Sequence, residues 1–394
     1  MEGMAPQSLA LGKSDTPVLA RARELFAGIV RGEGHAGSTA AELADRIEQQ
    51  LSLAIPGPCT LTEGSIAIRY GVGRRVARQT SRILQQRGIM EPRRGGNGLG
   101  GLWAVVPELN QIVSAVHAEI DPCDRKAATD EAAFWLRPAL ETHVNAPTEL
   151  FDHLLGGGPD AGADTHAHAR ARDVRSTQAN RVATCLVEEI GAASCDDVYL
   201  GSLAAVSLRY NVSLEVVVEA VRILEDHQQV VLKRGRRGGI YLANPRYGKA
   251  LHMTNAFLAG RQTSPADCRT LLDAVNYAMI ELACQRHDDQ GVLRVRQAFS
   301  AMEQARDSTA LGKAWYSFIR EIADLAGNPI LHFTARALAG SILMRRVRSS
   351  ELPDPAAREL FDASRLILDN ILNHSDAGNK EAHLRCQFAL ENYW

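Results

Sequence analysis

The chain has few aromatic residues, no closely spaced cysteine pairs and no long apolar run. Phe, Trp and Tyr make up only 5% of its 394 residues, while abundant Ala, Leu and Arg favour helices. Its seven cysteines form no CxxC pair and no zinc-like cluster, which favours reduced thiols over a disulfide framework. No stretch approaches the roughly 18 consecutive apolar residues of a membrane helix, and the N-terminal residues lack the apolar segment of a signal peptide. We therefore expect a cytoplasmic protein without a membrane partner.

An excess of one charge is also lacking, since 44 Lys and Arg residues face 46 Asp and Glu residues. With a net charge of −2, the molecule as a whole does not attract nucleic acid, so any such role must be local. The sequence shows no nucleophile elbow, no acid–base constellation and no glycine-rich phosphate loop between a strand and a helix. We expect neither an enzyme nor a bound cofactor.

One segment is present twice, at residues 61–95 and 201–235, 140 residues apart and without a gap. Residues 68–72 (IRYGV) return as residues 208–212 (LRYNV). Each copy belongs to a pattern of three helices followed by a β-hairpin, which is typical of a winged helix-turn-helix. Because the length allows two or three domains, the repeat indicates two such domains in one chain.

In the first copy we expect helices over 40–51, over 62–70 with Thr62 as its N-cap, and over 74–86, ended by Gly88. A hairpin should follow over 91–106. From residue 247 onward every segment has helical periodicity, with breaks that indicate five or six helices. The expected fold is mainly α: two winged helix-turn-helix domains, each of three helices and a β-hairpin wing, and a C-terminal all-α helical bundle. The expected units are 18–107 (first winged helix), 108–155 (helical segment), 156–173 (flexible linker), 174–244 (second winged helix) and 249–394 (bundle).

The second helix of a helix-turn-helix lies in the major groove, where Arg can read guanine with about 1–3 kcal/mol of discrimination. In the first copy this helix carries five arginines and no acid: Arg74, Arg75, Arg78, Arg82 and Arg87. A solvated arginine-rich surface helix is the plain alternative, but five like charges at the groove-facing position favour DNA binding. We expect Arg74, Arg75 and Arg78 to read bases, and Arg93 and Arg94 of the wing to contact the DNA backbone. The full set of expected DNA contacts is Arg74, Arg75, Arg78, Arg82, Arg93, Arg94 and Thr62.

The second copy has the opposite charge on the matching helix. There Arg74 is replaced by Leu214 and Arg78 by Val218, and the net charge is −3 from Glu215, Glu219, Glu225 and Asp226 against Arg222. Phosphates would repel such a helix. We expect that it has lost base reading and packs against another protein surface through exposed Val217 and Val218. A backbone contact stays open for its basic wing (Lys233, Arg234, Arg236 and Arg237).

These residues resemble the GntR family of bacterial transcription factors. The similarity lies in residues 61–63 (LTE), 66–67 (IA), 71–78 (GVGRRVAR) and Gly88. By this resemblance, Arg74 and Arg78 correspond to the arginines that contact operator DNA. Gly73 departs from the usual Ser or Thr cap, and Gly64 stands where many members have an Arg that contacts DNA.

The C-terminal region resembles the FCD effector domain of the FadR subfamily, through residues 269–273 (RTLLD) and 322–329 (IADLAGNP). Residues 110–145 resemble the start of the same domain, which implies a duplicated regulator with its first effector domain truncated. The family's domain often holds a metal through Asp and three His. The aligned residues are Trp315, Ile319, Ser364 and Gln387, so no metal site is expected. His166 and His168 fall in the linker and are taken as solvated.

The resemblance implies a bacterial transcriptional regulator, a repressor, that binds operator DNA as a homodimer through residues 249–394. A small organic acid would be its effector, with Arg269, Lys313, Arg320 and Arg336 as candidates to bind it. Each of these residues could equally be an ordinary surface charge. The alternative function is a tandem winged-helix replication initiator or an architectural DNA-binding protein without an effector.

Overall fold

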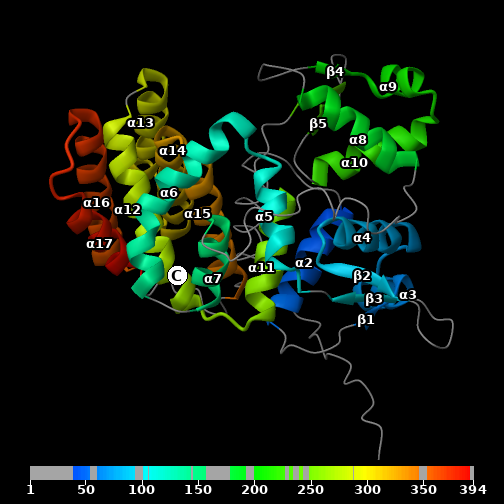
Figure 1. Cartoon of the computed structure of the whole chain (residues 1–394), viewed down its shortest axis with the longest axis horizontal. Coiled ribbons are helices and arrows are strands. Elements are labelled where there is room, and N and C mark those ends of the chain that lie inside the picture. Colours follow the sequence, from blue (N-terminus) through cyan, green and yellow to red (C-terminus); the bar gives the residue numbers. More distant parts are fainter. Residues whose placement is uncertain are drawn as a thin grey trace, which may run out of the picture.

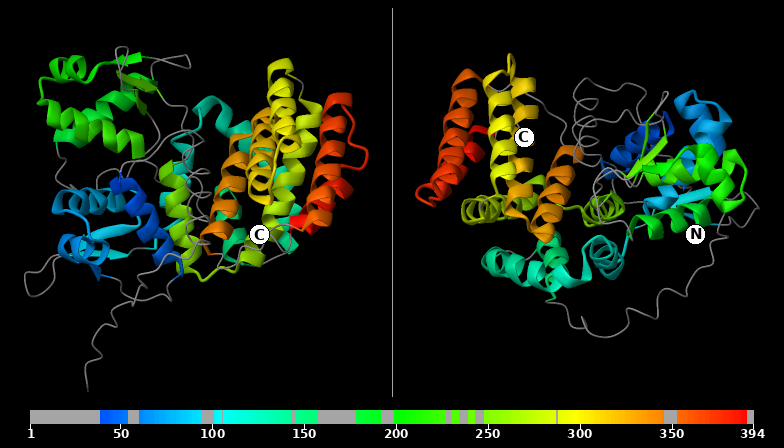
Figure 2. Two further views of the ribbon diagram at one scale, coloured as in Figure 1. Left: turned by 180° about the vertical axis from the view of Figure 1, so that it is seen from behind. Right: turned by 90° about the horizontal axis from the view of Figure 1, so that it is seen from above.

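The computed structural model describes residues 39–53, 60–93, 101–104, 106–142, 145–156, 178–191, 199–226, 230–233, 239–242, 248–286, 288–345 and 353–390. A helical bundle lies on one side of the molecule and two smaller modules lie on the other, one stacked on the other (Figure 1). The view from behind in Figure 2 shows the same stacking. Among the described residues, no helix has both the length and the apolar character needed to cross a bilayer.

The first module combines helices with a small antiparallel sheet whose strand order is β1-β3-β2. Its core is formed by apolar side chains of the three helices, with Ile47, Ile66 and Leu84 almost fully buried. Its elements are α2 (Thr39–Leu53), β1 (Thr60–Leu61), α3 (Glu63–Tyr70), α4 (Arg74–Gln86), β2 (Met90–Arg93) and β3 (Gly101–Ala104).

Local sequence sets the ends of α3 and α4. The Thr62 hydroxyl accepts a hydrogen bond from the Ser65 amide at 3.0 Å, and the Ser65 hydroxyl accepts one from the Thr62 amide at 2.8 Å. Gly71 then ends α3 with a φ of +64°, a conformation that glycine adopts without strain. Gly73 gives α4 no side-chain cap. The helices expected over 62–70 and 74–86 are thus confirmed to within a residue.

The second module has the same element order and the same sheet order, β4-β6-β5. Asn211 stands where the first copy has Gly71, with a φ of +49°, because Asn is one of the few other residues that tolerate the left-handed region. Val217 is fully buried and Val218 is half-buried, so the prediction that both are exposed was wrong: Val217 occupies the core position of Ala77. Its elements are α8 (Gln178–Gly191), β4 (Tyr199–Gly201), α9 (Leu203–Tyr210), α10 (Leu214–Asp226), β5 (Val230–Lys233) and β6 (Gly239–Leu242).

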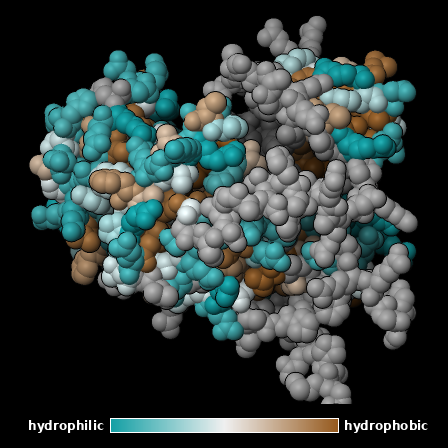
Figure 3. Space-filling view, in the orientation of Figure 1, coloured by the Kyte–Doolittle hydropathy of each residue, from teal (hydrophilic) through white to brown (hydrophobic). Residues whose placement is uncertain are grey.

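The bundle contains seven helices among its described residues, rather than the five or six expected. Its surface in the view of Figure 3 is mostly hydrophilic, with small apolar patches. The breaks between helices fall where Gly and Pro predicted them, for example between Gly260 and Pro265. The helices are α11 (Gly248–Gly260), α12 (Pro265–Gln285), α13 (Asp289–Glu303), α14 (Ser308–Ala326), α15 (Pro329–Arg345), α16 (Asp354–Asn373) and α17 (Asn379–Leu390).

Helices α5 (Leu109–His117), α6 (Pro122–Thr142) and α7 (Ala146–Leu154) share one hydrophobic core with this bundle. The rings of Phe151 and Phe333 lie 6.4 Å apart, edge to face, and Asn328 Nδ2 donates to the Ala128 carbonyl at 3.0 Å. Helix α5 packs on α11, and α6 packs on α12. The segment 108–155 is therefore an integral layer of the bundle, and α5 and α11 lie on the side of the bundle that faces the first module (Figure 1).

Candidate nucleic-acid interface and effector site

The first turns of α4 carry three exposed arginines, Arg74, Arg75 and Arg78. No acid belongs to this helix, and its buried side chains lie on the opposite face. Arg78 Nε lies 3.2 Å from Glu63 Oε2, but both side chains are well exposed, by 62% and 47%. A surface pair of this kind contributes at most about 1 kcal/mol, less than a good guanine contact. The pair therefore leaves Arg78 available to an anionic partner.

Arg82 points to the second module instead. It forms an ion pair with Glu219 of α10, and Arg222 of the same helix donates from Nη1 to Gln79 Oε1 at 3.3 Å. Arg82 is half-exposed, with 46% of its side chain accessible. Among the contacts between described residues, this is the one of the four α4 arginines expected at DNA that pairs with the second copy.

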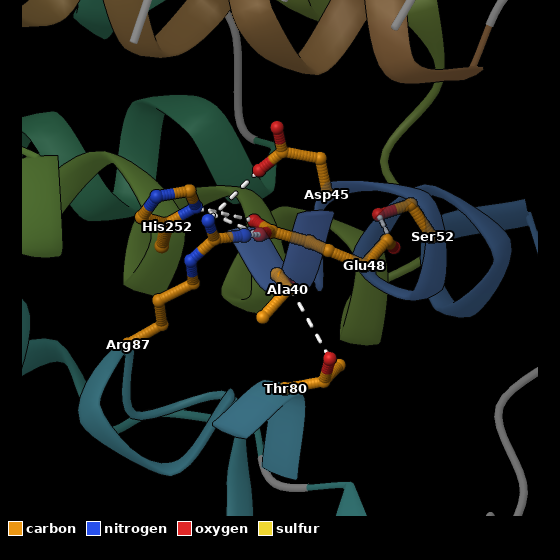
Figure 4. Close-up of polar contacts among 7 residues, drawn as sticks. All are labelled: Ala40, Asp45, Glu48, Ser52, Thr80, Arg87 and His252. Carbon is orange, nitrogen blue, oxygen red and sulfur yellow. Dashed lines mark hydrogen bonds and ion pairs between the residues drawn. The ribbon is translucent and has the colours of Figure 1, made fainter. Parts of the chain in front are cut away.

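Arg87, counted in the sequence among the five arginines of the reading helix, turns inward. Its guanidinium lies 2.8 Å from Asp45 Oδ1 and 3.0 Å from Glu48 Oε2, and only 3% of its side chain is exposed. Figure 4 shows this cluster, in which His252 Nδ1 of α11 lies 2.7 Å from the same Glu48 oxygen, Oε2, and 2.9 Å from Oε1. The inclusion of Arg87 in the exposed charge of this helix was therefore wrong, because it neutralises two buried carboxylates of α2. The cluster also ties the end of α4 to the bundle.

The remaining expected DNA contacts lie at the edges of the module. Thr62 is half-buried, and its hydroxyl is engaged in the cap of α3. Arg93 ends strand β2, paired in register with Gly101 of β3. Arg94 lies outside the described residues.

A second cluster of polar groups lies inside the bundle, between α12 and α17. Burial raises the pKa of Asp273 to about 7, although a hydrogen bond from Gln387 and the charge of Arg269 oppose the shift. Burial lowers the pKa of His383 to about 4, and this ring hydrogen-bonds the Asp273 backbone. Gln387 Nε2 lies 2.9 Å from His383 Nε2, so its amide bridges the two titratable groups. Burial also raises the pKa of Tyr316, the α14 side chain that is near Arg269. The cluster can offer an anion one guanidinium and several hydrogen-bond donors.

Of the four cations expected at an effector, only Arg269 belongs to this cluster. Lys313 is exposed on α14. Arg320 Nη2 lies 2.8 Å from Glu321 Oε1, and Arg336 is half-buried on α15. Asp273 and His383 were not predicted from the sequence, where cations alone were considered as effector ligands. The i, i+4 spacing of His383 and Gln387 was the available signal.

The four positions aligned with the family's metal ligands do not make a donor set. Trp315 and Ile319 have no metal-binding atom, and the Ser364 hydroxyl lies 3.7 Å from the Cys386 thiol. Elsewhere in the described residues, no group of three or more His, Cys, Asp or Glu side chains is placed to hold a metal ion.

Comparison with known proteins matches residues 253–385 to the FCD domain. That match covers the helices around Arg269, Asp273 and His383. The chain thus carries an FCD domain within its helical bundle. A GntR protein of Streptococcus agalactiae is similar in structure at 16% identity, over 55% of this chain and 97% of the other, with a TM-score of 0.36. No curated protein matches the sequence. FCD domains are the C-terminal effector-binding domains of GntR-family regulators.

Proposed function

We propose that the chain represses transcription by binding operator DNA through α4, which is the recognition helix of a winged helix-turn-helix formed by the first module. The observation that carries the proposal is the exposed face of Arg74, Arg75 and Arg78, without an acid on the same helix. Arg74 and Arg78 lie one turn apart and can reach adjacent base edges. The FCD match favours a regulator over a replication initiator.

The second module is, in this proposal, a duplicated winged helix that no longer reads bases. Its helix α10 presents Leu214 and Val218 where α4 presents Arg74 and Arg78. The proposed units remain 18–107 and 174–244 for the two winged helices, and 249–394 for the effector domain. Residues 108–155 supplement that domain, since they share its core.

Selection from a random-sequence duplex pool tests operator binding. The wild-type chain should enrich one sequence motif, and raising the salt concentration should weaken binding because phosphate contacts contribute. A pool from which no sequence is enriched would contradict operator recognition.

A reporter gene placed behind the enriched motif tests repression. Its expression should fall when the chain is produced; a rise would contradict repression and leave binding intact.

A homodimer through residues 249–394 would place two reading heads on a two-fold operator. Leu384 and Phe388 lie one turn apart on α17, exposed by 55% and 75%, and such a dimer would cover them. Sedimentation of the wild-type chain should give twice the chain mass, and Phe388→Lys should give the chain mass. A wild-type chain that sediments at the chain mass contradicts the dimer.

The effector proposed is a small organic acid bound beside Arg269. Its carboxylate would pair with this guanidinium, while Gln387 and a protonated Asp273 would donate hydrogen bonds. A panel of organic acids should therefore include one that raises the melting temperature of the wild-type chain. Arg269→Ala should lose that shift and Lys313→Ala, on the exposed side of α14, should keep it. Equal loss in both variants, or no shift with any acid, contradicts this site.

A further inference from the structure

Helices α4 and α10, the equivalent helices of the two copies, contact each other. The contacts are reciprocal: Arg82 pairs with Glu219, and Arg222 donates to Gln79 at 3.3 Å. Arg222 is the equivalent of Arg82, and Glu219 is the equivalent of Gln79, 140 residues later in each case. The same two positions of each helix thus meet around a local pseudo-two-fold axis. Figure 1 shows α10 stacked over α4.

The contact lies on the face of α4 that points away from its own core. At 100° per residue, Arg82 and Gln79 lie roughly opposite the buried side chains Ala77 and Leu84. In a helix-turn-helix this outward face enters the major groove. A DNA duplex and α10 therefore need the same space over the second half of α4.

The chemistry of α10 fits this position. Its outward face offers the carboxylates of Glu215 and Glu219, and Glu219 reaches the guanidinium that a phosphate would otherwise meet. The substitution of Glu219 for the Gln79 of the first copy places an acid where it neutralises Arg82. The loss of base-reading residues from α10 and its contact with α4 thus have one common explanation, namely that the outward face of α10 binds α4.

We propose that the second module is an intramolecular competitor of DNA: α10 covers the outward face of α4 and must separate from it before the recognition helix enters a major groove. The proposal rests on the proposed function of α4. Arg74, Arg75 and Arg78 stay exposed in the closed arrangement, so a duplex can be attracted before the helices part. The apparent affinity for DNA is then the affinity of the open molecule multiplied by the fraction of molecules that are open.

Charge reversal at the contact is the first test, with the duplex enriched by the wild-type chain as probe. Glu219→Arg in the full chain should open the contact and tighten binding. Glu215→Arg makes the same charge change on the same helix, at an exposed position one turn away, and controls for the added positive charge. Because the pair is half-exposed, Glu219→Arg should exceed its control by up to about fivefold. Equal gains in the two variants overturn the proposal.

A covalent lock tests it independently. Gln79→Cys with Arg222→Cys can be joined by a cleavable bifunctional maleimide, in a chain whose Cys59, Cys123, Cys185 and Cys195 are replaced by Ser. The joined protein should bind the enriched duplex more than about tenfold more weakly, and cleavage of the linker should restore binding. Arg222→Cys alone, treated alike, should be unaffected. A locked chain that binds as tightly as the cleaved one overturns the competition alone, whereas a pool that yields no enriched duplex overturns the proposed function and this inference with it.

Discussion

At the scale of single residues, the arginines of α4 and its C-terminal end lie in three different environments. Arg74, Arg75 and Arg78 are exposed, Arg82 pairs with the other module, and Arg87 is buried between two carboxylates. Sequence periodicity could place the exposed three on one side of a helix. It could not separate Arg87 from them, since the buried acids Asp45 and Glu48 are about 40 residues distant.

Removal of the Arg87 guanidinium should be costly. Arg87→Met leaves Asp45 and Glu48 buried without their cation, so the free energy of unfolding should fall by about 3–5 kcal/mol. Arg82→Met removes an exposed pair and should cost about 1 kcal/mol or less. Urea unfolding of the two variants measures the difference. Equal losses would show that the buried cluster contributes no more than a surface pair.

The uncapped start of α4 allows a stabilising change. Gly73 has an extended backbone with φ of −64°, and a Cβ there would meet nothing within 4 Å. In the second copy the equivalent Ser213 Oγ lies 3.4 Å from the Val216 amide, close enough to cap α10. Gly73→Ser should therefore raise the free energy of unfolding by about 0.5 kcal/mol, while Gly73→Ala, which cannot cap, should not raise it. Thermal unfolding of both variants checks the order, and a more stable Ala variant would refute the cap.

At the scale of elements, helix limits followed closely from local chemistry. Thr62, Gly71 and Gly88 mark the helix ends of the first module, and Gly and Pro mark the breaks between the helices of the bundle. The packing of the elements did not follow. Nothing in the local pattern shows that α5–α7 join the bundle core, or that α10 faces α4, because both depend on contacts between segments far apart in the chain. The contact of His383 with the backbone of Asp273 likewise joins two segments that are far apart in the chain.

The pair between α12 and α17 should give opposing pH dependences. The raised pKa of Asp273 means that the unfolded chain loses this proton first, so stability falls as pH rises from about 4 to about 7. The lowered pKa of His383 means that the unfolded chain takes up a proton first, so stability falls as pH drops from about 6.5 to about 4. In the wild type the two slopes offset each other over this window.

Single substitutions should uncover each slope. Asp273→Asn should leave stability rising with pH between about 4 and 6.5, by at most about 1.4 kcal/mol per pH unit, and His383→Gln should leave it falling. Asp362→Asn, at an exposed position of α16, should keep the wild-type profile. Urea unfolding across this pH range provides the measurement. Slopes of the same sign in the two variants would contradict the assignment.

At the scale of the whole molecule, the two modules share an element order but contact different surroundings. The bundle and the first module are joined through the buried contact of His252 with Glu48, so the proposed reading helix is linked to the effector domain. The second module contacts that same helix from its outward side. An effector that shifts α11 would thus act on α4 from one side, while α10 competes with DNA from the other.

The central claim is that one of the two copies reads DNA, and a footprint at single-base-pair resolution on the enriched duplex tests it most directly. Arg74→Ala with Arg78→Ala should abolish the specific footprint, because each lost guanine contact costs about 1–3 kcal/mol, roughly 5- to 150-fold in affinity. Leu214→Ala with Val218→Ala, the matched change in the second copy, should leave every protected base pair in place. A specific footprint that survives the first double substitution, or that shifts with the second, would contradict the account.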